Sequence, residues 1–495
     1  MKTLAITAGL IMMATGASAQ TTAQPPAPSG SPTDWSRALK EDAQALHDVI
    51  ADSHPGPVDP ENPAFKVVLE QGLTLAQNRA RTARRYEDWY FAMQQYAKSF
   101  NDGHLSLTGY TPNDHAWRME WPGFLTAGND DADVVVFNKD AAAPPVGARL
   151  VSCDGETPEA LAERIVGQNV GQWALKSTRA VYSNTLFVDQ SNPYARRPES
   201  CVFNVEGVDR TYRLSWRVLD NADRDEGLAK GRNLTFVPPI GLRSWGDGFW
   251  IGMGSFESSQ GSPRTAALTV LDGEVKSQAE ALRNARVVVF DLRGNSGGSS
   301  IWGSDIARTL WGDGWVDAHA PHSTAVDWRA SQGNLDEISS YRAQFAANPT
   351  MIAWIDAVEG GLKRTRAAGQ PLWRQASEDT AEVPPPAPTP APTTGMRAQT
   401  YVFTDSGCAS ACLDTLDLLK ALGAVHVGQE TSADTLYMNA REQVLPGGRV
   451  SVVVPMKVYR GRVRGNNETV IPDREWTGAL SDTVGIEAWI ADLSK

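Results

Sequence analysis

Ser410 is the residue of this sequence whose type and position best suit chemistry. It lies in Gly407-Cys-Ala-Ser-Ala-Cys412, after the apolar run 401–403 and before leucines at helical spacing. A serine at the turn from strand to helix lies beside free backbone N–H groups and the positive end of the helix dipole. Because an oxyanion forming there would meet donors already in place, the position suits a nucleophile. The alternative is that Ser410 only caps the helix, as serine commonly does.

His104 is a candidate general base. It follows the turn signal Asn101-Asp-Gly103 and precedes an apolar alternation at Leu105 and Leu107 that predicts a strand. An imidazole held on a defined turn has a pKa suited to proton transfer near neutral pH. The alternative is a partly exposed turn histidine without a role in catalysis.

A glycine-rich loop is the third candidate. Residues 287–290 predict a buried strand, and Asp291-Leu-Arg-Gly-Asn-Ser-Gly-Gly298 follows it. Glycines let backbone N–H groups approach a ligand closely, although a tight loop can also serve packing alone. The lysine spacing of a phosphate-binding loop is missing, which excludes that reading. We expect Asp291 and Arg293 to hold the loop rather than to react.

The elements around these residues fall into three regions. Apolar residues at helical spacing predict a helical domain over 34–112, with helices near 35–50, 64–77 and 86–100. Short β-like runs predict a β-rich domain over 113–238. Its segment 146–158 has the order of strand, Asp-Gly turn and helix that many PDZ domains have in their middle. This domain could therefore dock a peptide by strand addition, or it could be a β-rich spacer without such a role.

The region 239–495 alternates strands and helices and holds Ser410 and the glycine-rich loop. An insertion is predicted at about 315–398, with a largely helical stretch at 341–374 and a proline-rich extended tract at 381–394. Within the main fold, 266–272 reads as strand or helix, whereas 424–428 and 450–454 read as strands. A closing helix is predicted at 486–493.

The ends and composition of the chain indicate its compartment and partners. Residues 1–19 have the charged, apolar and small-residue regions of a secretory signal, and residues 20–33 read as a disordered linker. A cleaved signal predicts a secreted or periplasmic protein; an uncleaved anchor is the alternative. The formal net charge of −12 argues against nucleic acid and anionic membrane surfaces as partners, and no later apolar run is long enough to span a membrane.

The four cysteines of an exported chain predict two disulfides, for which three pairings are possible. We favour Cys153 with Cys201 and Cys408 with Cys412 over four reduced thiols. A thiol nucleophile at Cys408 or Cys412 is a further alternative to Ser410. The seven histidines show no metal-ligand spacing, so the sequence implies neither a metal nor an organic cofactor.

Taken together, the motifs resemble the serine peptidase family of the tail-specific (C-terminal processing) proteases and tricorn protease. The resemblance rests on Asp102-Gly-His104, 291–298 and Ala409-Ser-Ala411, with support from 427–431 and 471–473. It implies an α+β multidomain fold: an N-terminal helical domain, a β-rich and possibly PDZ-like middle, and a C-terminal ββα-superhelix domain like that of the crotonase and Clp protease group.

The resemblance also implies a mechanism and its residues. The tail-specific branch uses a serine–lysine dyad, but the place of that lysine falls near Asp434 and Thr435, and no lysine lies between Lys420 and Lys457. The tricorn-like branch uses serine, histidine and glutamate. That branch implies peptide-bond hydrolysis through an acyl-enzyme. Its triad here would be Ser410 as nucleophile, His104 as base and Glu468 as third member, with Glu442 and Glu430 as alternatives to Glu468. The oxyanion hole would be formed by the amides of Gly297, Gly298 and Ala411.

Other functions stay open at this point. The retinoid-binding repeats of the vertebrate retina resemble the same family, so a non-catalytic protein that binds an apolar ligand or a peptide is the main alternative. A peptide-docking scaffold with an inactive site is a second one. The partner of the enzyme would be a peptide or an unfolded protein, and the sequence leaves substrate preference and oligomeric state open.

Overall fold

The fold is described from a computed structural model of the chain, which describes residues 33–112, 115–129, 132–231, 237–259, 261–346, 348–376 and 394–495. The predicted signal segment and nearly all of the predicted linker lie outside these residues, as does nearly all of the proline-rich tract. No helix in the described ranges is long and apolar enough to cross a membrane. The described chain is a mixed α+β structure with a helical N-terminal region and several sheets.

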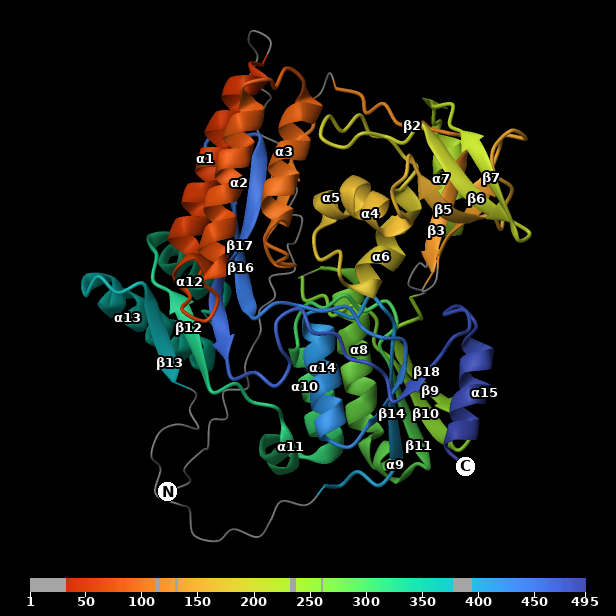
Figure 1. The fold of residues 1–495 in the computed structure, drawn as a ribbon. Coiled ribbons are helices and arrows are strands. Elements are labelled where there is room, and N and C mark those ends of the chain that lie inside the picture. Colours follow the sequence, from red (N-terminus) through yellow and green to blue (C-terminus); the bar gives the residue numbers. More distant parts are fainter. Residues whose placement is uncertain are drawn as a thin grey trace.

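The N-terminal region is a group of three helices packed against the end of the chain. Asp34 caps the first helix by accepting a hydrogen bond from the Arg37 amide (3.1 Å), and the helix ends where His54-Pro-Gly-Pro57 begins. Leucines of these helices share a hydrophobic core with valines of the C-terminal strand β17 (Val450–Arg460). Figure 1 shows the helices beside this strand. The elements are α1 (Trp35–Ser53), η1 (Gly56–Val58), α2 (Ala64–Ala80) and α3 (Tyr86–Lys98).

The middle region is built on a five-stranded antiparallel sheet of order β3-β4-β5-β6-β7. Cys153 and Cys201 face each other across β5 and β6 and form a disulfide, which confirms that predicted pair. The elements are β1 (Ser106–Gly109), β2 (Glu120–Trp121), β3 (Phe124–Asn129), β4 (Ala132–Asn138), β5 (Arg149–Cys153), α4 (Pro158–Ala162), η2 (Glu163–Gly167), α5 (Gln168–Val170), α6 (Lys176–Tyr182), η3 (Ser183–Thr185), β6 (Ser200–Val205), β7 (Val208–Arg213), β8 (Arg217–Val218) and α7 (Asn221–Gly231).

A six-stranded sheet of order β18-β15-β14-β11-β10-β9 carries the serine and glycine motifs. Its strands are parallel from β10 to β18, so β11 and β14 end at the same edge. The sheet comprises β9 (Gly241–Trp245), β10 (Gly248–Gly252), β11 (Val287–Asp291), β14 (Gln399–Thr404), β15 (Val425–Gly428) and β18 (Arg474–Glu475).

Helices cover both faces of this sheet (Figure 1). Val288, Phe290 and Val402 point toward α8, α10 and α14, whereas Val287 and Val289 point toward α15. This burial on both faces explains the unbroken apolar run that predicted a buried strand. The covering helices and their neighbours are α8 (Pro263–Ser277), α9 (Ala279–Asn284), α10 (Ile301–Trp311), α11 (Asp313–His319), α14 (Ala411–Ala421) and α15 (Thr483–Leu493).

A second sheet joins the N-terminal turn to the C-terminal half. β1, which follows His104, pairs with β17, and β17 also pairs with β12 and β16. Part of the predicted insertion therefore belongs to this sheet. The helical stretch predicted for 341–374 was wrong at its end, because residues 372–374 belong to strand β13, which pairs with β12. The elements are β12 (Ala325–Arg329), α12 (Gln332–Gln344), α13 (Pro349–Ala367), β13 (Leu372–Ala376) and β16 (Tyr437–Val444).

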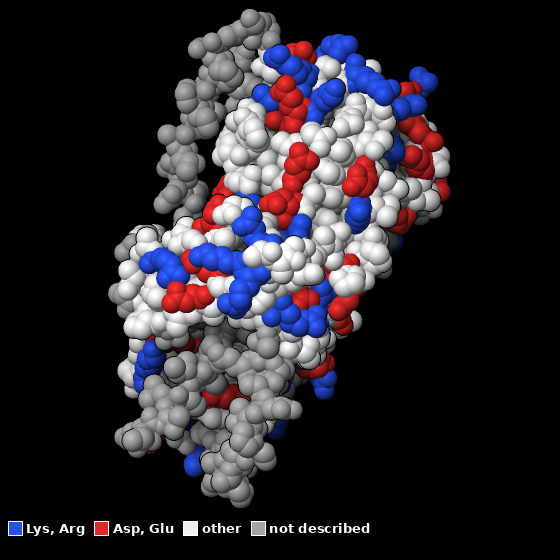
Figure 2. All heavy atoms as spheres, turned by 90° about the vertical axis from the view of Figure 1, so that its left-hand side faces the viewer, with Lys and Arg blue, Asp and Glu red and all other residues white. Residues whose placement is uncertain are grey.

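Charged side chains are interspersed on the face that Figure 2 shows. On α12, α13 and β13, basic residues pair with acidic neighbours: Arg342 with Asp356, Lys363 with Glu359, and Arg374 with Asp327. Glu359 and Asp327 are buried, whereas Arg342–Asp356 is an exposed pair, of the kind that stabilises a fold by at most about 1 kcal/mol. These pairs leave this face without a continuous patch of one sign.

Candidate active site

Ser410 occupies the N-cap position of α14, but it does not act as a cap. Its side chain makes no capping hydrogen bond, so the interpretation as a simple helix cap is wrong. Its backbone has φ 53° and ψ −125°, a region that residues other than glycine rarely adopt. Strand β14 and helix α14 therefore present, within the described part of the chain, a hydroxyl that makes no capping bond and lies on a strained turn.

The glycine-rich loop packs directly against this turn. A Cβ atom built on Gly297 would lie 2.8 Å from both Ala409 O and Ser410 Cβ, and 3.3 Å from Ala411 N. Gly297 also has φ +105°, so only glycine fits this close approach without strain. The structure thus brings Gly297, Ser410 and Ala411 together.

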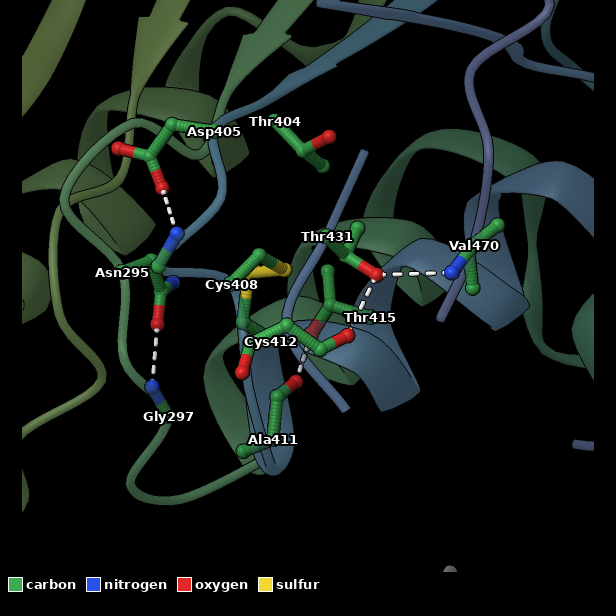
Figure 3. Close-up of a disulfide and its surroundings, with 12 residues drawn as sticks. Asn295, Gly297, Thr404, Asp405, Cys408, Ala411, Cys412, Thr415, Thr431 and Val470 are labelled. Carbon is green, nitrogen blue, oxygen red and sulfur yellow. Dashed lines mark hydrogen bonds between the residues drawn. A yellow bond between two sulfur atoms is a disulfide. The ribbon is translucent and has the colours of Figure 1, made fainter. Parts of the chain in front are cut away.

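The three amides proposed for an oxyanion hole differ in their hydrogen bonds. The Gly297 amide donates to Asn295 Oδ1 at 2.9 Å (Figure 3). Gly298 lies beside Phe256, but it makes neither of the two hydrogen bonds there. The Phe256 amide donates to the Gly297 carbonyl, and the Ser299 amide donates to the Phe256 carbonyl. Within the described residues, the amides of Gly298 and Ala411 donate to no protein acceptor. Two N–H groups near Ser410 are therefore unused.

Asp291 and Arg293 hold the glycine-rich loop, as predicted from the sequence. Both are fully buried, and the Arg293 guanidinium donates to both carboxylate oxygens of Asp291. Arg293 Nη1 also donates to the Leu480 carbonyl (2.5 Å), which ties the loop to the segment before α15.

Asp405 joins the glycine-rich loop to the serine loop, a role the sequence did not reveal. Its Oδ2 accepts the Gly294 amide at 2.7 Å and its Oδ1 accepts the Gly407 amide at 2.8 Å (Figure 3). Burial raises the pKa of Asp405 to about 6, although the two amide bonds lower it. An acidic residue directly after a strand and before a glycine-containing loop is the signal that could have identified it.

Asp102 organises the turn that carries His104. Its Oδ1 accepts the His104 amide (2.8 Å) and the Thr435 hydroxyl (3.0 Å), and its Oδ2 lies 3.1 Å from His54 Nε2. Burial opposes the charge of Asp102, but the bond from His54 and the nearby histidines keep its pKa below the usual value. The ring of His104 does not share these bonds: its Nδ1 is buried and has no partner in the described part.

His54 is a site residue that sequence reasoning missed. Its Nδ1 accepts the Gly56 amide at 2.8 Å, so the proton lies on Nε2 and is donated to Asp102. Burial lowers the pKa of His54, despite its bond to Asp102, which keeps the ring neutral. The break after α1 at His54-Pro-Gly-Pro57 was the available signal, since a histidine fixed at a helix end has a defined position.

The position expected for a dyad lysine is used differently here. Thr435 binds Asp102, and Asp434 pairs with Arg464. Lys457 lies in β17, buried, with its Nζ 5.0 Å from the ring centroids of both Trp328 and Tyr459. Burial lowers the pKa of Lys457 to about 7. Thr435 thus supports the histidine turn where the related branch would have a catalytic amine.

Glu468 lies in a loop that contacts the histidine turn. Its Oε2 accepts the Gly465 amide at 2.5 Å. The neighbouring Asn467 donates to the Asn101 carbonyl (2.8 Å) and accepts a bond from Gln172 (2.6 Å), which in turn donates its amide to the Asn101 side chain.

The alternative glutamates have other partners. Glu430 accepts a bond from Thr469 (2.7 Å) and lies 3.6 Å from Lys176, whereas Glu442 accepts the Ser451 hydroxyl. In the described part of the chain, no hydrogen bond joins the His104 ring to Ser410 or to any of the three glutamates.

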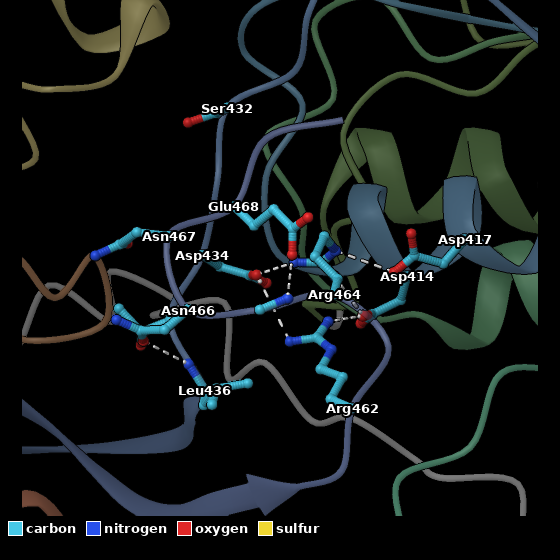
Figure 4. A network of polar contacts seen from close by, with 12 residues as sticks. Asp414, Asp417, Ser432, Asp434, Leu436, Arg462, Arg464, Asn466, Asn467 and Glu468 are labelled. Atoms are coloured by element: carbon cyan, nitrogen blue, oxygen red, sulfur yellow. Dashed lines mark hydrogen bonds and ion pairs between the residues drawn. The ribbon is translucent and has the colours of Figure 1, made fainter. Parts of the chain in front are cut away.

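A buried ionic network connects the Glu468 loop to neighbouring elements (Figure 4). Arg464 is 4% exposed and pairs with Asp434, with Asp417 (3.0 Å) and with Asp414 (3.3 Å). Asp414 and Asp417 belong to α14, the helix that begins after Ser410. Burial raises the pKa of Asp414 to about 6, and Arg462 and Arg464 lower it. The network therefore links the serine helix to the loop of the third candidate residue.

A cavity of about 320 Å³ lies away from these residues. Side chains of α3, of segments 165–197 and of Trp216 line it, among them Tyr90, Phe91 and Tyr182. Ser410, His104 and Glu468 are not among its lining residues. Within the residues that the structure describes, no group of three His, Cys, Asp or Glu residues could hold a metal ion.

The comparisons with known proteins concern the fold. No family model and no curated protein matches this sequence. The crystal structure of mature CPAF matches at 13% identity over 94% of this chain and 97% of that chain, with a TM-score of 0.56. Mature CPAF complexed with lactacystin matches at 12% identity over 94% and 98% of the two chains, with a TM-score of 0.54.

A structure of the photosystem II D1 C-terminal processing protease also matches, at 12% identity over 90% of this chain and 94% of that chain. Its TM-score of 0.31 is too low to support an argument on the fold. CPAF is of the tail-specific protease family. The resemblance predicted from the sequence is therefore confirmed at the level of the fold: this chain has the fold of the mature CPAF structures.

Proposed function

We propose that this chain is an exported serine-type peptidase that hydrolyses peptide bonds through an acyl-enzyme. The observation that carries the proposal is the Ser410 hydroxyl, which makes no capping bond and lies on a strained turn beside two unused amides, those of Gly298 and Ala411. A hydroxyl and amide donors in this arrangement suit attack on a carbonyl and stabilisation of the resulting oxyanion.

His104 is the proposed general base. It takes the Ser410 proton as the hydroxyl attacks the carbonyl, and it returns the proton to the leaving amine. The oxyanion accepts bonds from the Gly298 and Ala411 amides, each of which contributes about 3 kcal/mol of transition-state stabilisation. Water then hydrolyses the acyl-enzyme. The bonds that fix the backbone of the histidine turn through Asp102 support this role.

Glu468 is the proposed third member of the triad. Its loop is bound to the histidine turn through Asn467, and the Arg464 network holds the same loop to α14. Catalytic hydrogen bonds often form only when substrate is bound. We therefore propose that the bond between Glu468 and the His104 ring, and the bond from His104 to Ser410, form in the substrate complex.

We extend the proposal to architecture and compartment. The domain 239–495 would be a ββα-superhelix catalytic domain that follows a helical domain (34–112) and a PDZ-like middle domain (113–238). Residues 1–19 would direct export, and the two disulfides suit an oxidising compartment. The substrate would be a peptide or an unfolded protein, in keeping with the similarity of the fold to that of mature CPAF.

Substitution of the serine tests the proposal. Wild-type protein is expected to cleave an unfolded protein and to bind a fluorophosphonate probe covalently at Ser410, whereas Ser410→Ala is expected to do neither. Lactacystin, present in one CPAF structure, is a second probe. Retention of hydrolysis by Ser410→Ala would falsify the proposal. Comparison of Glu468→Gln, Glu442→Gln and Glu430→Gln identifies the third residue as the one whose loss lowers kcat most.

One observation favours the alternative of non-catalytic ligand binding. The cavity beside α3 is lined by aromatic and aliphatic side chains together with polar ones such as Asn169, Asn192 and Arg197, which suits a ligand that has an apolar body and a polar group. A binding protein would show neither hydrolysis nor covalent labelling of Ser410. It would instead take up an apolar fluorescent probe, and Tyr90→Ala would weaken that uptake.

A further inference from the structure

A disulfide encloses the proposed nucleophile. Cys408 and Cys412 are bonded to each other, which confirms this predicted pair, and Ser410 lies midway between them. The bond, which Figure 3 shows, joins Cys408 to Cys412. It closes a ring of five residues whose central member is Ser410. The same ring contains Ala411, the proposed oxyanion donor.

Both ends of the ring are anchored in the structure. Cys408 and Cys412 are fully buried in the core shared by α8, α10 and α14. The Cys408 amide donates to the Asp405 carbonyl (3.2 Å), and the Cys412 amide donates to the Ala409 carbonyl (3.1 Å). The disulfide therefore ties the loop that Asp405 holds to the first turn of α14.

The turn inside the ring needs such support. The left-handed φ of Ser410 is unfavourable for a residue with a side chain and persists only where the surroundings enforce it. The Ser410 hydroxyl makes no capping bond that would help. Gly297 supports the turn from one side by close packing, whereas the disulfide joins the residues on both sides of Ser410.

From these contacts we infer that the Cys408–Cys412 disulfide is the element that positions Ser410 and the Ala411 amide for catalysis. The inference rests on the proposed function and adds a dependence on oxidation to it. A dithiol reductant supplies two electrons and two protons, yields the Cys408 and Cys412 thiols, and itself becomes a cyclic disulfide. The reduced turn relaxes, and catalysis falls while the fold persists.

The second disulfide of the chain provides a matched control. Cys153–Cys201 joins two strands of the middle sheet, and neither residue belongs to the glycine-rich loop or to α14. Cys408→Ala/Cys412→Ala is expected to lower kcat about 10- to 100-fold, as for a misplaced reacting group, with KM changed less than about twofold. Cys153→Ala/Cys201→Ala is expected to keep its kcat within about twofold of wild type. The rate of fluorophosphonate labelling at Ser410 should follow kcat.

Reduction of the folded protein tests the inference without a substitution at the turn. In Cys153→Ala/Cys201→Ala, dithiothreitol acts on the remaining disulfide, and alkylation followed by mass spectrometry measures its reduction. Activity should fall with the fraction of reduced Cys408 and Cys412 and return on reoxidation, while circular dichroism stays unchanged. This arm decides the matter if Cys408→Ala/Cys412→Ala does not fold.

Three results would overturn the inference. They are full kcat in folded Cys408→Ala/Cys412→Ala, full activity of protein whose Cys408 and Cys412 are alkylated, and loss of activity only together with global unfolding. Failure of the proposed function is recognised separately, because oxidised wild-type protein would then neither hydrolyse the unfolded substrate nor be labelled at Ser410.

Discussion

His54 Nε2 and Asp102 Oδ2 form a fully buried hydrogen bond of 3.1 Å between residues 48 positions apart in the sequence. The same carboxylate accepts the His104 amide. The end of α1 is thereby connected to the turn of the proposed base. Since the bond leaves the His104 ring itself unengaged, His54 acts on the position of His104 rather than on its chemistry.

The first prediction concerns this bond. His54→Ala removes the donor to the buried Asp102 Oδ2, while Oδ1 keeps its bonds from His104 and Thr435, and is expected to lower the free energy of unfolding by about 2–3 kcal/mol. It should also lower kcat. His54→Gln, which retains a donor, should recover part of both losses. Urea unfolding and steady-state kinetics measure these effects.

His47→Ala is the control, because His47 lies on the same helix and its ring nitrogens pair with the exposed Asp48 and Glu70. His47→Ala should change the free energy of unfolding by no more than about 0.5 kcal/mol. An equal loss in the two alanine variants would show that the Asp102 bond has no special role.

The second prediction separates backbone strain from contact with the nucleophile. Gly297 and Gly312 both have a positive φ, of +105° and +93°. The added Cβ of Gly297→Ala would collide with the serine turn, whereas the Cβ of Gly312→Ala would have no atom within 4 Å. Strain should destabilise the fold by about 1 kcal/mol in each variant, and the collision adds to this destabilisation in Gly297→Ala. Gly297→Ala alone should lower kcat, by about 100-fold. Unchanged kcat in Gly297→Ala would contradict the proposed oxyanion geometry.

The third prediction is a pH dependence of stability. Burial, followed by the charge of Lys420, lowers the pKa of His426 from 6.5 to about 4. Between these values the unfolded chain binds a proton that the folded protein excludes. Stability from His426 is therefore complete above about pH 6.5 and is lost as the pH falls toward 4, by about 3 kcal/mol.

The difference between wild type and His426→Gln isolates this effect. Burial raises the pKa values of Asp405 and Asp414 to about 6, so the contribution of these two groups to stability increases as the pH falls. This contribution is the same in wild type and in His426→Gln. Wild type should lose more stability than His426→Gln between pH 6.5 and 4 in urea unfolding, whereas the exposed control His319→Gln should behave as wild type. Parallel profiles for wild type and His426→Gln would refute the assignment.

The fourth prediction concerns the ionic network beneath the Glu468 loop. Arg464→Ala removes the nearest partner of the buried Asp434, to which only Arg462 at 3.6 Å then remains among the described residues, and should lower the free energy of unfolding by about 3 kcal/mol, whereas Asp414 keeps its pair with Arg462. Arg243→Ala breaks the pair with Glu487, in which Arg243 is 44% exposed, and should change stability by less than about 1 kcal/mol. Thermal unfolding of both variants measures the two losses of stability. Similar decreases in Tm for Arg464→Ala and Arg243→Ala would contradict the prediction.

Local patterns account for much of the agreement between sequence and structure. The three N-terminal helices, the buried strand β11 and the serine turn were predicted from apolar spacing and turn residues that lie within a few positions of one another. The stretch 266–272 was ambiguous and forms part of α8, because a short apolar run does not distinguish a buried strand from a buried helix.

By itself, the sequence determined most of the elements named above, the position of Ser410 between β14 and α14, and the glycines that allow close approach to it. Only the tertiary structure decided that His54 and Thr435 meet at Asp102, that Asp405 bridges two loops, and that β12 joins β17 and β1 in one sheet. The physical reason is range. Helix and turn preferences act between near neighbours, whereas these contacts join residues that are adjacent only after the sheets have formed, and such pairing leaves no periodic signal in the chain.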